Sequence, residues 1–565
     1  MTTRAWPLCI LTVLFATLVA CVASAPSGNA PAPPRAPDDI VKEWKDAGAK
    51  VVWVRVEKWN DFYGYEGHFK IVPQRNRKPG DLPGFCFTDW PAKNLVQLKD
   101  PNTAFALFLG FSKITDEGLK ALAPFKSLQL LSLCNTQVTG AGLDALAQLP
   151  RLQMLNLRET PMTEAGLQKL TRLKSLQLVD LGQVPVTDDW LKELAKLENL
   201  CALILRKTEV KGVGLAAFSE FKSLRTLDLA ELPLENNELE VLALANPNLQ
   251  ALNLARTRVT NDGLAALRKF KHLQALDLGR TQLTGAGLKP FAKFQSLRVL
   301  GLSEVPMTDD GLEILSELAD LESLNLSSLG DLAGPEKRQL ATLTEKGLLS
   351  LARLKKLQIL YLNGTPVTDK VLNALSVRDT LRELGLADTQ ITDTGLLTLT
   401  RFPNLESLIF AKTTLTNKGL ETVGRLKKLR FLNLEETGVT DEGLTNLYGL
   451  DKLESLDLWK TGVSDEGIQK IKQKIPGLHV SRRAPIENLP KPLEPKKVAP
   501  PDSTHWRWLL YGLLALVAAL GGGWGAKRVL TKKPSNPPKP RTDRMGLGAD
   551  GKGGVWFREV PPWEK

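Results

Sequence analysis

The sequence predicts an α/β solenoid in which a parallel β-sheet lines a concave face and helices cover the convex face. A unit of about 24 residues recurs from residue 104 to residue 480. Each copy spaces its leucines as a short strand followed by a helix would. One unit cannot bury these leucines alone, so stacked neighbours must close the core. A chain of 565 residues is also too long for one ordinary globular core.

The repeats keep a regular register along the chain. The clearest copy is LQALNLARTRVTNDGLAALRKFKH, which starts at Leu249 and returns in altered form at Leu273 and Leu429. First positions of fifteen units fall at residues 104, 128, 152, 176, 200, 224, 249, 273, 297, 321, 357, 381, 405, 429 and 453. Only the step from 321 to 357 departs from 24 or 25 residues, because it contains an insertion, residues 330–341.

Each part of the unit has a physical role. Leu252 and Leu254 alternate as inward-facing residues of a strand do. Thr257, at the ninth position, is expected to bond the backbone of the next turn. In TDEGL, residues 115–119, the threonine suits a helix N-cap and the acidic residues suit the helix macrodipole. The LxxL spacing that follows turns an apolar helix face inward.

The full pattern LxxLxLxxTxVTDxGLxxLxxL resembles the leucine-rich repeat family, and in particular bacterial proteins with TDxGL-type repeats. The resemblance covers residues 104–480. It implies a horseshoe-shaped solenoid of about 15 repeats of 24 residues, with the parallel sheet on the concave face. It also implies a binding module rather than an enzyme.

Charge and motifs exclude several function classes. The chain carries a net charge of +12, but residues 104–480 are neutral, so the surplus belongs to the two ends. A neutral repeat domain lacks the basic footprint of nucleic-acid binding, so no nucleic-acid partner is expected. No nucleophile, phosphate-loop or metal-ligand motif occurs, so we predict no enzyme activity, no cofactor and no metal site.

Two groups of residues are candidates for a binding surface on the concave side. One is a locally basic stretch in the early and middle repeats; the other is a set of late aromatic residues of the type that anchors interfaces. The basic residues are Arg158, Arg206, Lys207, Arg256 and Arg280, and the aromatic residues are Tyr361, Phe431 and Trp459. A solvated polar sheet face explains the same pattern. The insertion at 330–341 is either a recognition loop or a tolerated surface insertion.

Residues 38–103 are rich in aromatic residues and precede the repeats. They read as an amphipathic helix followed by a strand, which favours a cap over the open end of the core. The NDFYGYEGHF segment is also a candidate ligand-binding turn. For Cys86 and Cys134, a disulfide and two buried thiols are both compatible with the sequence.

Residues 1–25 have the features of a secretory signal, with Arg4 before an apolar run of 13 residues. LVAC at 18–21 resembles the lipobox of bacterial lipoproteins, which would make Cys21 a lipidation site. Ordinary cleavage near Ser24 or Ala25 is the alternative. A proline-rich linker, residues 26–37, follows.

The C-terminal region predicts a membrane anchor. Residues 481–505 are a proline-rich spacer, and residues 506–526 are an apolar segment with tryptophans at one edge and Lys527 and Arg528 after the other. Positive residues mark the cytoplasmic side, so the basic tail, residues 527–565, is expected to be cytoplasmic and disordered, and the repeats extracytoplasmic. A buried helix is the alternative for 506–526. Trp556, Phe557 and Trp563 in the tail are a candidate docking motif.

These features favour a single-pass protein of the cell membrane whose solenoid binds a protein or glycan. Two alternatives remain from the sequence. One is a structural adhesion or envelope protein without a dedicated ligand. The other is an adaptor of the ubiquitin-ligase type, which the signal and the apolar segment argue against.

Overall fold

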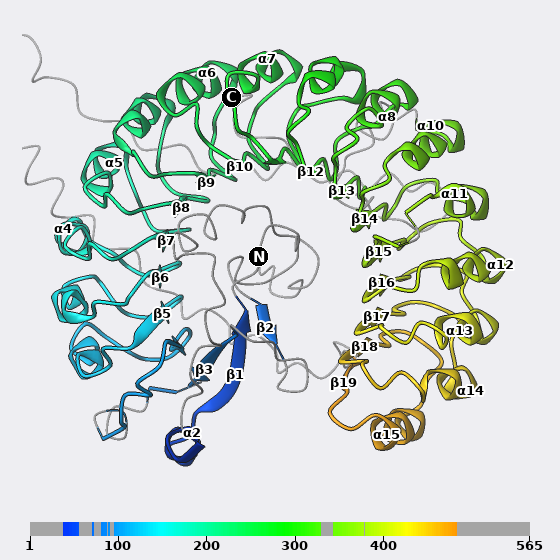
Figure 1. The fold of residues 1–565 in the computed structure, drawn as a ribbon, viewed down its shortest axis with the longest axis horizontal. Helices are drawn as coiled ribbons and strands as arrows, with labels where there is room; N and C mark the ends of the chain where they lie inside the picture. Colours follow the sequence, from blue (N-terminus) through cyan, green and yellow to red (C-terminus); the bar gives the residue numbers. More distant parts are fainter. Residues whose placement is uncertain are drawn as a thin grey trace, which may run out of the picture. The chain divides into compact units, whose positions relative to one another are not determined.

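The computed structural model describes residues 38–482, apart from 56–69, 73–80, 88, 91–94, 96, 329–342 and 378. Within these residues the strands line the inner side of an arc and the helices lie along its outer side (Figure 1). The predicted signal, linker, membrane segment and tail lie outside the described residues, as do the insertion, the candidate ligand-binding turn and residues 483–505 of the predicted spacer, whose first residue, Ser481, belongs to the last strand.

A single sheet runs through the described part of the chain and contains nineteen strands. The first strand, β1, pairs antiparallel with β2 and β3. From β3 to β19, each strand pairs parallel with the next. The strands are β1 (Lys50–Arg55), β2 (Lys70–Val72), β3 (Leu82–Cys86), β4 (Phe105–Phe108), β5 (Leu128–Ser132), β6 (Met154–Asn156), β7 (Leu178–Asp180), β8 (Ala202–Ile204), β9 (Thr226–Asp228), β10 (Ala251–Asn253), β11 (Ala275–Asp277), β12 (Val299–Gly301), β13 (Ser323–Asn325), β14 (Ile359–Tyr361), β15 (Glu383–Gly385), β16 (Ser407–Ile409), β17 (Phe431–Asn433), β18 (Ser455–Asp457) and β19 (His479–Ser481).

The predicted register is confirmed by the strand pairing. Leu252 lies opposite Leu276, one unit later. The sheet continues without a slip across the insertion, because Leu324 pairs with Leu360. Strand β4 belongs to the first predicted unit and β18 to the fifteenth, and β19 extends the sheet by one further strand.

The convex side is made of short helices, as predicted, but many turns are 3-10 rather than α-helical. A unit of 24 residues leaves room for only one or two turns, which the tighter i→i+3 bonding can close. The α-helices are α2 (Asp38–Asp46), α4 (Glu164–Leu170), α5 (Asp188–Leu194), α6 (Asn236–Ala245), α7 (Leu264–Leu267), α8 (Asp309–Leu315), α10 (Glu345–Leu349), α11 (Asp369–Ala374), α12 (Asp393–Leu396), α13 (Asn417–Val423), α14 (Asp441–Leu444) and α15 (Asp465–Lys474). The 3-10 helices are Gly118–Leu122, Leu143–Gln148, Gly212–Glu220, Asn261–Gly263, Gly285–Gly287, Lys289–Lys293, Ser350–Arg353, Leu397–Arg401 and Thr445–Leu447.

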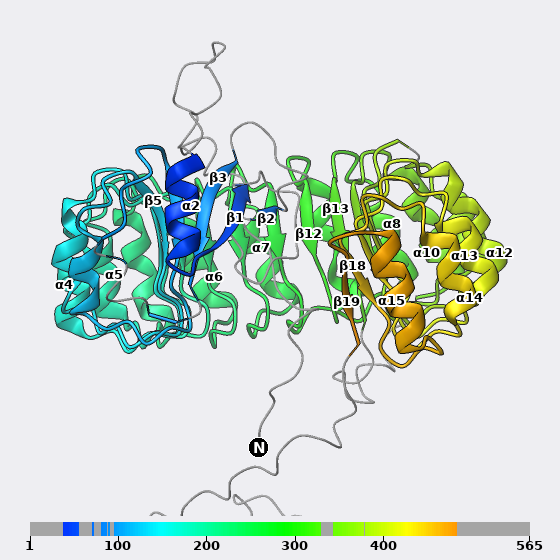
Figure 2. The ribbon, with the colours of Figure 1, turned by 90° about the horizontal axis from the view of Figure 1, so that it is seen from below.

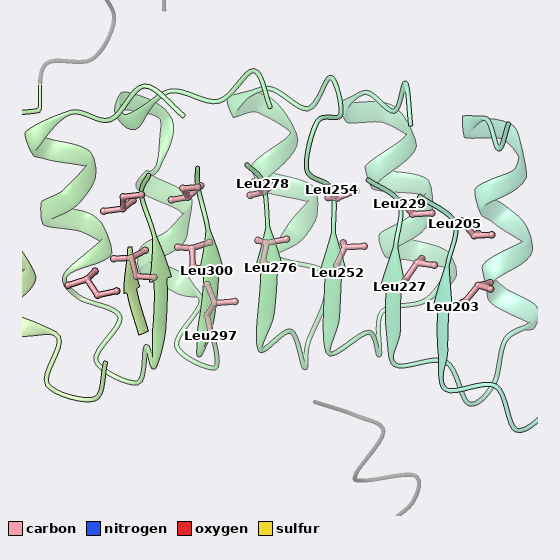
Figure 3. Close-up of a cluster of buried hydrophobic side chains, with 14 of the residues drawn as sticks. Leu203, Leu205, Leu227, Leu229, Leu252, Leu254, Leu276, Leu278, Leu297 and Leu300 are labelled. Carbon is pink, nitrogen blue, oxygen red and sulfur yellow. The ribbon is translucent and has the colours of Figure 1, made fainter. Parts of the chain in front are cut away.

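The core is a ladder of leucines between the sheet and the helices. The two strand leucines of each unit, such as Leu252 and Leu254, stack on those of the next, Leu276 and Leu278 (Figure 3). These side chains are almost fully buried. Each unit therefore contributes apolar area only when both neighbours are present, which is why the repeats fold as one body.

The segment before the repeats closes the first end of this core. Helix α2 lies beside the first strands of the sheet (Figure 2), and its Trp44 is fully buried. The Trp44 ring lies 4.3 Å from the ring of Phe85 and 5.2 Å from that of Phe125, measured between centroids. Cys86 and Cys134 both remain thiols, so the disulfide that the sequence left open is not formed. Strand β4 pairs between β3, which contains Cys86, and β5, which ends two residues before Cys134.

Neighbouring repeats are joined by the aspartate of the TDxGL motif. Asp369 accepts hydrogen bonds from the backbone N–H of Thr392, at 2.9 Å, and from its hydroxyl, at 2.6 Å. The Thr392 hydroxyl in turn accepts from the N–H of Thr394 and so caps α12. A Cβ added at Gly395 would lie 2.0 Å from Oδ1 of Asp369, so the glycine leaves the space that the carboxylate fills.

We call this arrangement the aspartate bridge. It explains why the motif needs aspartate, threonine and glycine together: the aspartate of one repeat meets the threonine and the glycine of the next. The same two bonds recur at Asp116–Thr139, Asp309–Thr344, Asp393–Thr416 and Asp441–Ser464. Where asparagine replaces aspartate, its oxygen still accepts from the threonine N–H, but its amide donates to the threonine hydroxyl; these pairs are Asn236–Thr260, Asn261–Thr284 and Asn417–Thr440.

The threonine at the ninth position acts differently from the prediction. Its hydroxyl does not bond the next turn but donates to the carbonyl three residues earlier in its own unit. In Thr257 the bond to the Leu254 carbonyl is 2.7 Å long, and in Thr389 the bond to Leu386 is 2.6 Å. The short side chain reaches only the local turn, and the contact between units is left to the backbone and to the aspartate bridge.

The aspartate bridge predicts a coupled effect on stability. We expect Asp369→Ala to lower the free energy of unfolding by about 1–3 kcal/mol, because it leaves the Thr392 N–H without its acceptor. Gly395→Ala should also destabilise the protein, although alanine usually favours a helix over glycine. In the Asp369→Ala background, Gly395→Ala should cost little or stabilise. Thermal melting of the four proteins measures this coupling.

Gly438→Ala is the matched control, because the nearest atom to an added Cβ there is the Leu415 carbonyl oxygen at 3.3 Å. Equal effects of Gly395→Ala with and without Asp369 would show that the carboxylate does not set the need for glycine.

Candidate binding surface

Each strand presents two side chains to the concave side, one before the first inward leucine and one between the two leucines. In β10 these are Ala251 and Asn253, on either side of Leu252. The residue between the leucines serves mainly a structural role. Its side-chain oxygen accepts from the N–H two residues later, as in Asn253 to Ala255, at 2.9 Å, and Asp180 to Gly182, at 2.8 Å. This local turn ends the strand.

The two halves of the concave face differ in exposure. In the early repeats an apolar stripe runs across the concave side of the sheet, and its residues are buried: Val52, Val54, Leu82, Ala106, Phe108, Leu130, Met154, Leu178, Ala202 and Ile204. From β15 to β18 most of the corresponding side chains are only half-buried: Glu383, Ser407, Ile409, Phe431, Asn433, Ser455 and Asp457. The sequence interpretation missed the stripe, although five of its residues stand one place before the first inward strand residue in successive units: Ala106, Leu130, Met154, Leu178 and Ala202.

The predicted basic stretch consists of arginines held by glutamates. Arg206 is buried, and its Nε donates to Glu231 Oε1 at 3.0 Å. Arg256 reaches the same oxygen at 3.3 Å. Arg280 contacts Glu304 at 2.6 Å. The structure therefore brings these three residues together, but as parts of ion pairs.

The other two basic candidates, Arg158 and Lys207, follow strands β6 and β8. Arg158 contacts Glu159 at 3.3 Å. Lys207 is exposed, and its amine lies 3.4 Å from Oε1 of Gln183. A signal for this pairing was present in the sequence, since glutamates stand at the equivalent position in units adjacent to the basic ones.

Lys207, Arg256 and Arg280 belong to a single row at the end of the strands, which we call the rim row. One residue per unit in this row has a left-handed backbone, and φ is 59° at Arg256. The N–H of Arg256 then points to the next unit and donates to the Gly279 carbonyl at 2.8 Å. The non-glycine members are Phe111, Asn135, Glu159, Gln183, Lys207, Glu231, Arg256, Arg280, Glu304, Asp388, Lys412, Glu436 and Lys460.

The three predicted aromatic residues differ in accessibility. Tyr361 is buried; its ring edge lies where a Cβ on Gly385 would stand, and its hydroxyl donates to Glu383. Phe431 and Trp459 are half-buried. Phe431 precedes the first leucine of β17, whereas Trp459 follows the second leucine of its unit, so they occupy different rows of the concave side.

Cations lie against both half-buried rings. The Arg430 guanidinium is 5.4 Å from the Phe431 ring centroid, and the Lys460 amine is 4.2 Å from that of Trp459. Arg430 is itself held by Glu454, at 2.6 Å from its Nε. The aromatic surface is thus placed within a network of charges.

Burial changes the acidity of carboxylates on the concave side. Burial raises the pKa of Asp180 to about 6, helped by the negative charge of Asp228 and opposed by the Gly182 N–H. Burial raises the pKa of Asp277 to about 6 in the same way. The pKa of Asp228 is also raised by burial. Within the described residues no group of histidine, cysteine, aspartate or glutamate is arranged to hold a metal ion.

Cys21 and the apolar segment at 506–526 lie outside the described residues, so their proposed roles stay predictions. Among the helices that the structure does describe, none combines the length and the apolar character needed to cross a bilayer.

The raised pKa values of Asp180 and Asp277 predict that these two concave aspartates destabilise the protein at neutral pH. Between about pH 4 and pH 6 the folded protein holds protons that the unfolded chain has released, so the free energy of unfolding falls as pH rises. Asp180→Asn and Asp277→Asn keep the acceptor oxygen, as Asn253 does naturally. Each should raise stability at pH 8 by about 1–3 kcal/mol and have little effect at pH 4.

Melting temperatures at pH 4, 6 and 8 test this effect. The control is Asp457→Asn, which changes the equivalent turn at a half-buried position and should have little effect at any of the three pH values. Variants as unstable at pH 8 as the parent would disprove a cost from buried charge.

Comparison with known proteins finds leucine-rich repeats in four segments of this chain. Residues 106–123, 245–267, 271–292 and 380–399 match a family model described as Leucine Rich repeat. A search of curated protein sequences gives no match.

Solved structures similar to this chain include an internalin from Listeria monocytogenes, at 21% identity and a TM-score of 0.33, covering 65% of this chain and 88% of that one. A leucine-rich repeat protein from Leptospira interrogans has 22% identity and a TM-score of 0.37, covering 66% and 95%. Mouse RP105, in its complex with MD-1, has 20% identity and a TM-score of 0.39, covering 69% of each chain.

Proteins of this fold are generally interaction modules, and the fold is typical of binding scaffolds rather than enzymes. The matched segments, the 24-residue register and the continuous parallel sheet agree with one another. The repeats of this chain form a leucine-rich repeat solenoid.

Proposed function

We propose that this protein is a membrane-anchored, extracytoplasmic receptor whose solenoid binds a protein partner without catalysis. The signal-like N-terminus and the apolar segment at 506–526 support the membrane location. The TDxGL motif also resembles that of bacterial repeat proteins. The observation that carries the binding role is the half-buried concave face between β15 and β18.

This late concave face has the properties of a preorganised interface. Its side chains stand on strands that are paired on both sides, so few degrees of freedom are lost when a partner binds. Ile409 and Phe431 supply apolar area, while Asn433 and Asp457 supply polar groups beside it. An apolar centre with a polar surround is the usual composition of a protein–protein interface.

A crosslinking experiment on the full-length protein in its native membrane tests this face. A photoreactive amino acid at Asn433 should capture a partner, and the same group at Lys418, exposed at the start of α13 on the convex side, should not. Phe431→Glu should abolish capture from Asn433, because it buries an unpaired charge in the interface. Leu397→Glu, at an exposed convex leucine, is the matched control.

Equal capture from both positions, or capture that survives Phe431→Glu, would rule out the late concave face. If the captured species is a glycan, the solenoid is a lectin-like receptor instead. If neither position captures anything, the structural role without a dedicated ligand is favoured.

Cysteine labelling tests the orientation across the membrane. In intact cells, a membrane-impermeant maleimide should label Lys418→Cys in the solenoid. It should label Ser535→Cys in the basic tail only after permeabilisation. The unsubstituted protein gives the background from the natural cysteines. The opposite pattern would place the repeats inside the cell and remove the basis for an extracytoplasmic receptor.

A further inference from the structure

The rim row contains one position where its charge pattern breaks. Along most of the row, a charged residue has a neighbour of opposite charge or a neutral neighbour, one unit away. Lys460 contacts Glu436 at 2.8 Å, and Asn135 donates to Glu159 at 2.9 Å. Among the row's described members, Arg256 and Arg280 are the only adjacent pair of like charge.

The two arginines share too few carboxylates. Oε1 of Glu231 accepts from two nitrogens of Arg206, and the contact from Arg256 is the longest of the three, at 3.3 Å. The Nε of Arg256 is buried and has no hydrogen-bond partner among the described residues. Arg280 uses one nitrogen on Glu304. Ala255 and Gly279, which precede the two arginines, bring no further acceptor side chain.

We propose that Arg256 and Arg280 form a binding site for a carboxylate side chain of an acidic protein partner. The proposal rests on the proposed function, because it names the chemistry of one contact of that receptor. The rim row itself supplies the precedent: wherever these arginines have a partner in the row, it is a glutamate carboxylate. A carboxylate placed between the two guanidinium groups restores the alternation that the row has elsewhere.

The charge environment of Arg256 agrees with this assignment. Its pKa is lowered by burial and then by the positive charge of Arg280, which outweighs the effect of Glu231. An anion between the two arginines removes that repulsion. Because the left-handed backbone fixes where each side chain leaves the sheet, the two guanidinium groups are held in adjacent units before a partner arrives.

The binding test uses the full-length protein in detergent and a fluorescent hexaglutamate peptide as the probe. The parent should bind the peptide, and a hexaglutamine peptide should not bind. Arg256→Gln and Arg280→Gln should each weaken hexaglutamate binding by about tenfold or more, measured by fluorescence anisotropy. Arg258→Gln is the matched control, since Arg258 is an exposed arginine only two residues away and is paired with Glu235 at 3.4 Å.

Thermal melting shows whether the variants still fold. Hexaglutamate should raise the melting temperature of the parent and of Arg258→Gln but not that of Arg256→Gln, and without the peptide Arg256→Gln should melt no lower than the parent. Failure of the parent to bind hexaglutamate, or equal binding by all three variants, overturns the proposal. Tighter binding of a sulfated heparin oligosaccharide, lost in the same variants, overturns the carboxylate assignment in favour of a sulfate.

The outcome is separable from that of the proposed function. Partner capture at Asn433 together with no hexaglutamate binding leaves the receptor intact and removes only this site. Hexaglutamate binding together with no capture keeps the arginine site and removes the late concave face as the interface.

Discussion

The aspartate bridge, in which a side chain at the start of one convex helix binds the threonine of the next repeat, is the interaction on which this solenoid depends. Asp369 does three things at once: it accepts two hydrogen bonds from Thr392, it orients the hydroxyl that caps the next helix, and it fills the space above Gly395. A leucine core alone tolerates sliding, because leucines in adjacent units are interchangeable. The aspartate bridge allows only one spacing between adjacent helices, because its hydrogen bonds are short and its carboxylate occupies the space that a side chain at Gly395 would fill. The hydrogen bonds of the parallel sheet set the same spacing on the concave side.

Polar groups throughout the solenoid follow the same rule of pairing between units. The row that precedes the strands contains an alternating ladder in the late repeats, in which Arg430 lies between Glu406 and Glu454. The rim row pairs in a similar manner at the other end of the strands. Residues 104–480 have a net charge of zero, and many of their opposite charges lie in pairs between units. Because many charges are already paired, few of them attract non-specific ligands. The few charges without a full set of partners therefore contribute most to specificity.

Much of the fold could be predicted from the sequence, because the 24-residue period determines which residues meet. Leu252 and Leu276 were expected to stack, and they do. The binding surface could not be predicted as well, because its properties depend on a neighbour about 24 residues away and on backbone direction. The sequence does not show that Glu231 forms an ion pair with Arg206, nor that the ring of Tyr361 packs over Gly385 and is buried there. The prediction for the ninth-position threonine was wrong for a related reason. The sequence shows that its hydroxyl can donate a hydrogen bond, but not that the carbonyl three residues earlier in its own unit is the nearest acceptor.

A scaffold with this much internal pairing limits how a partner can gain affinity. A ligand that binds a paired arginine must replace the ion pair with glutamate, so it gains little net binding energy there. The paired groups therefore mainly orient the ligand. In the proposed interface, net binding energy comes from apolar area that is still partly open, as at Ile409 and Phe431, and from the like-charged pair of Arg256 and Arg280. These two kinds of group lie in different repeats of one continuous sheet. A partner that uses both must therefore be long enough to follow the concave side across several units, which favours a folded or extended protein over a small ligand.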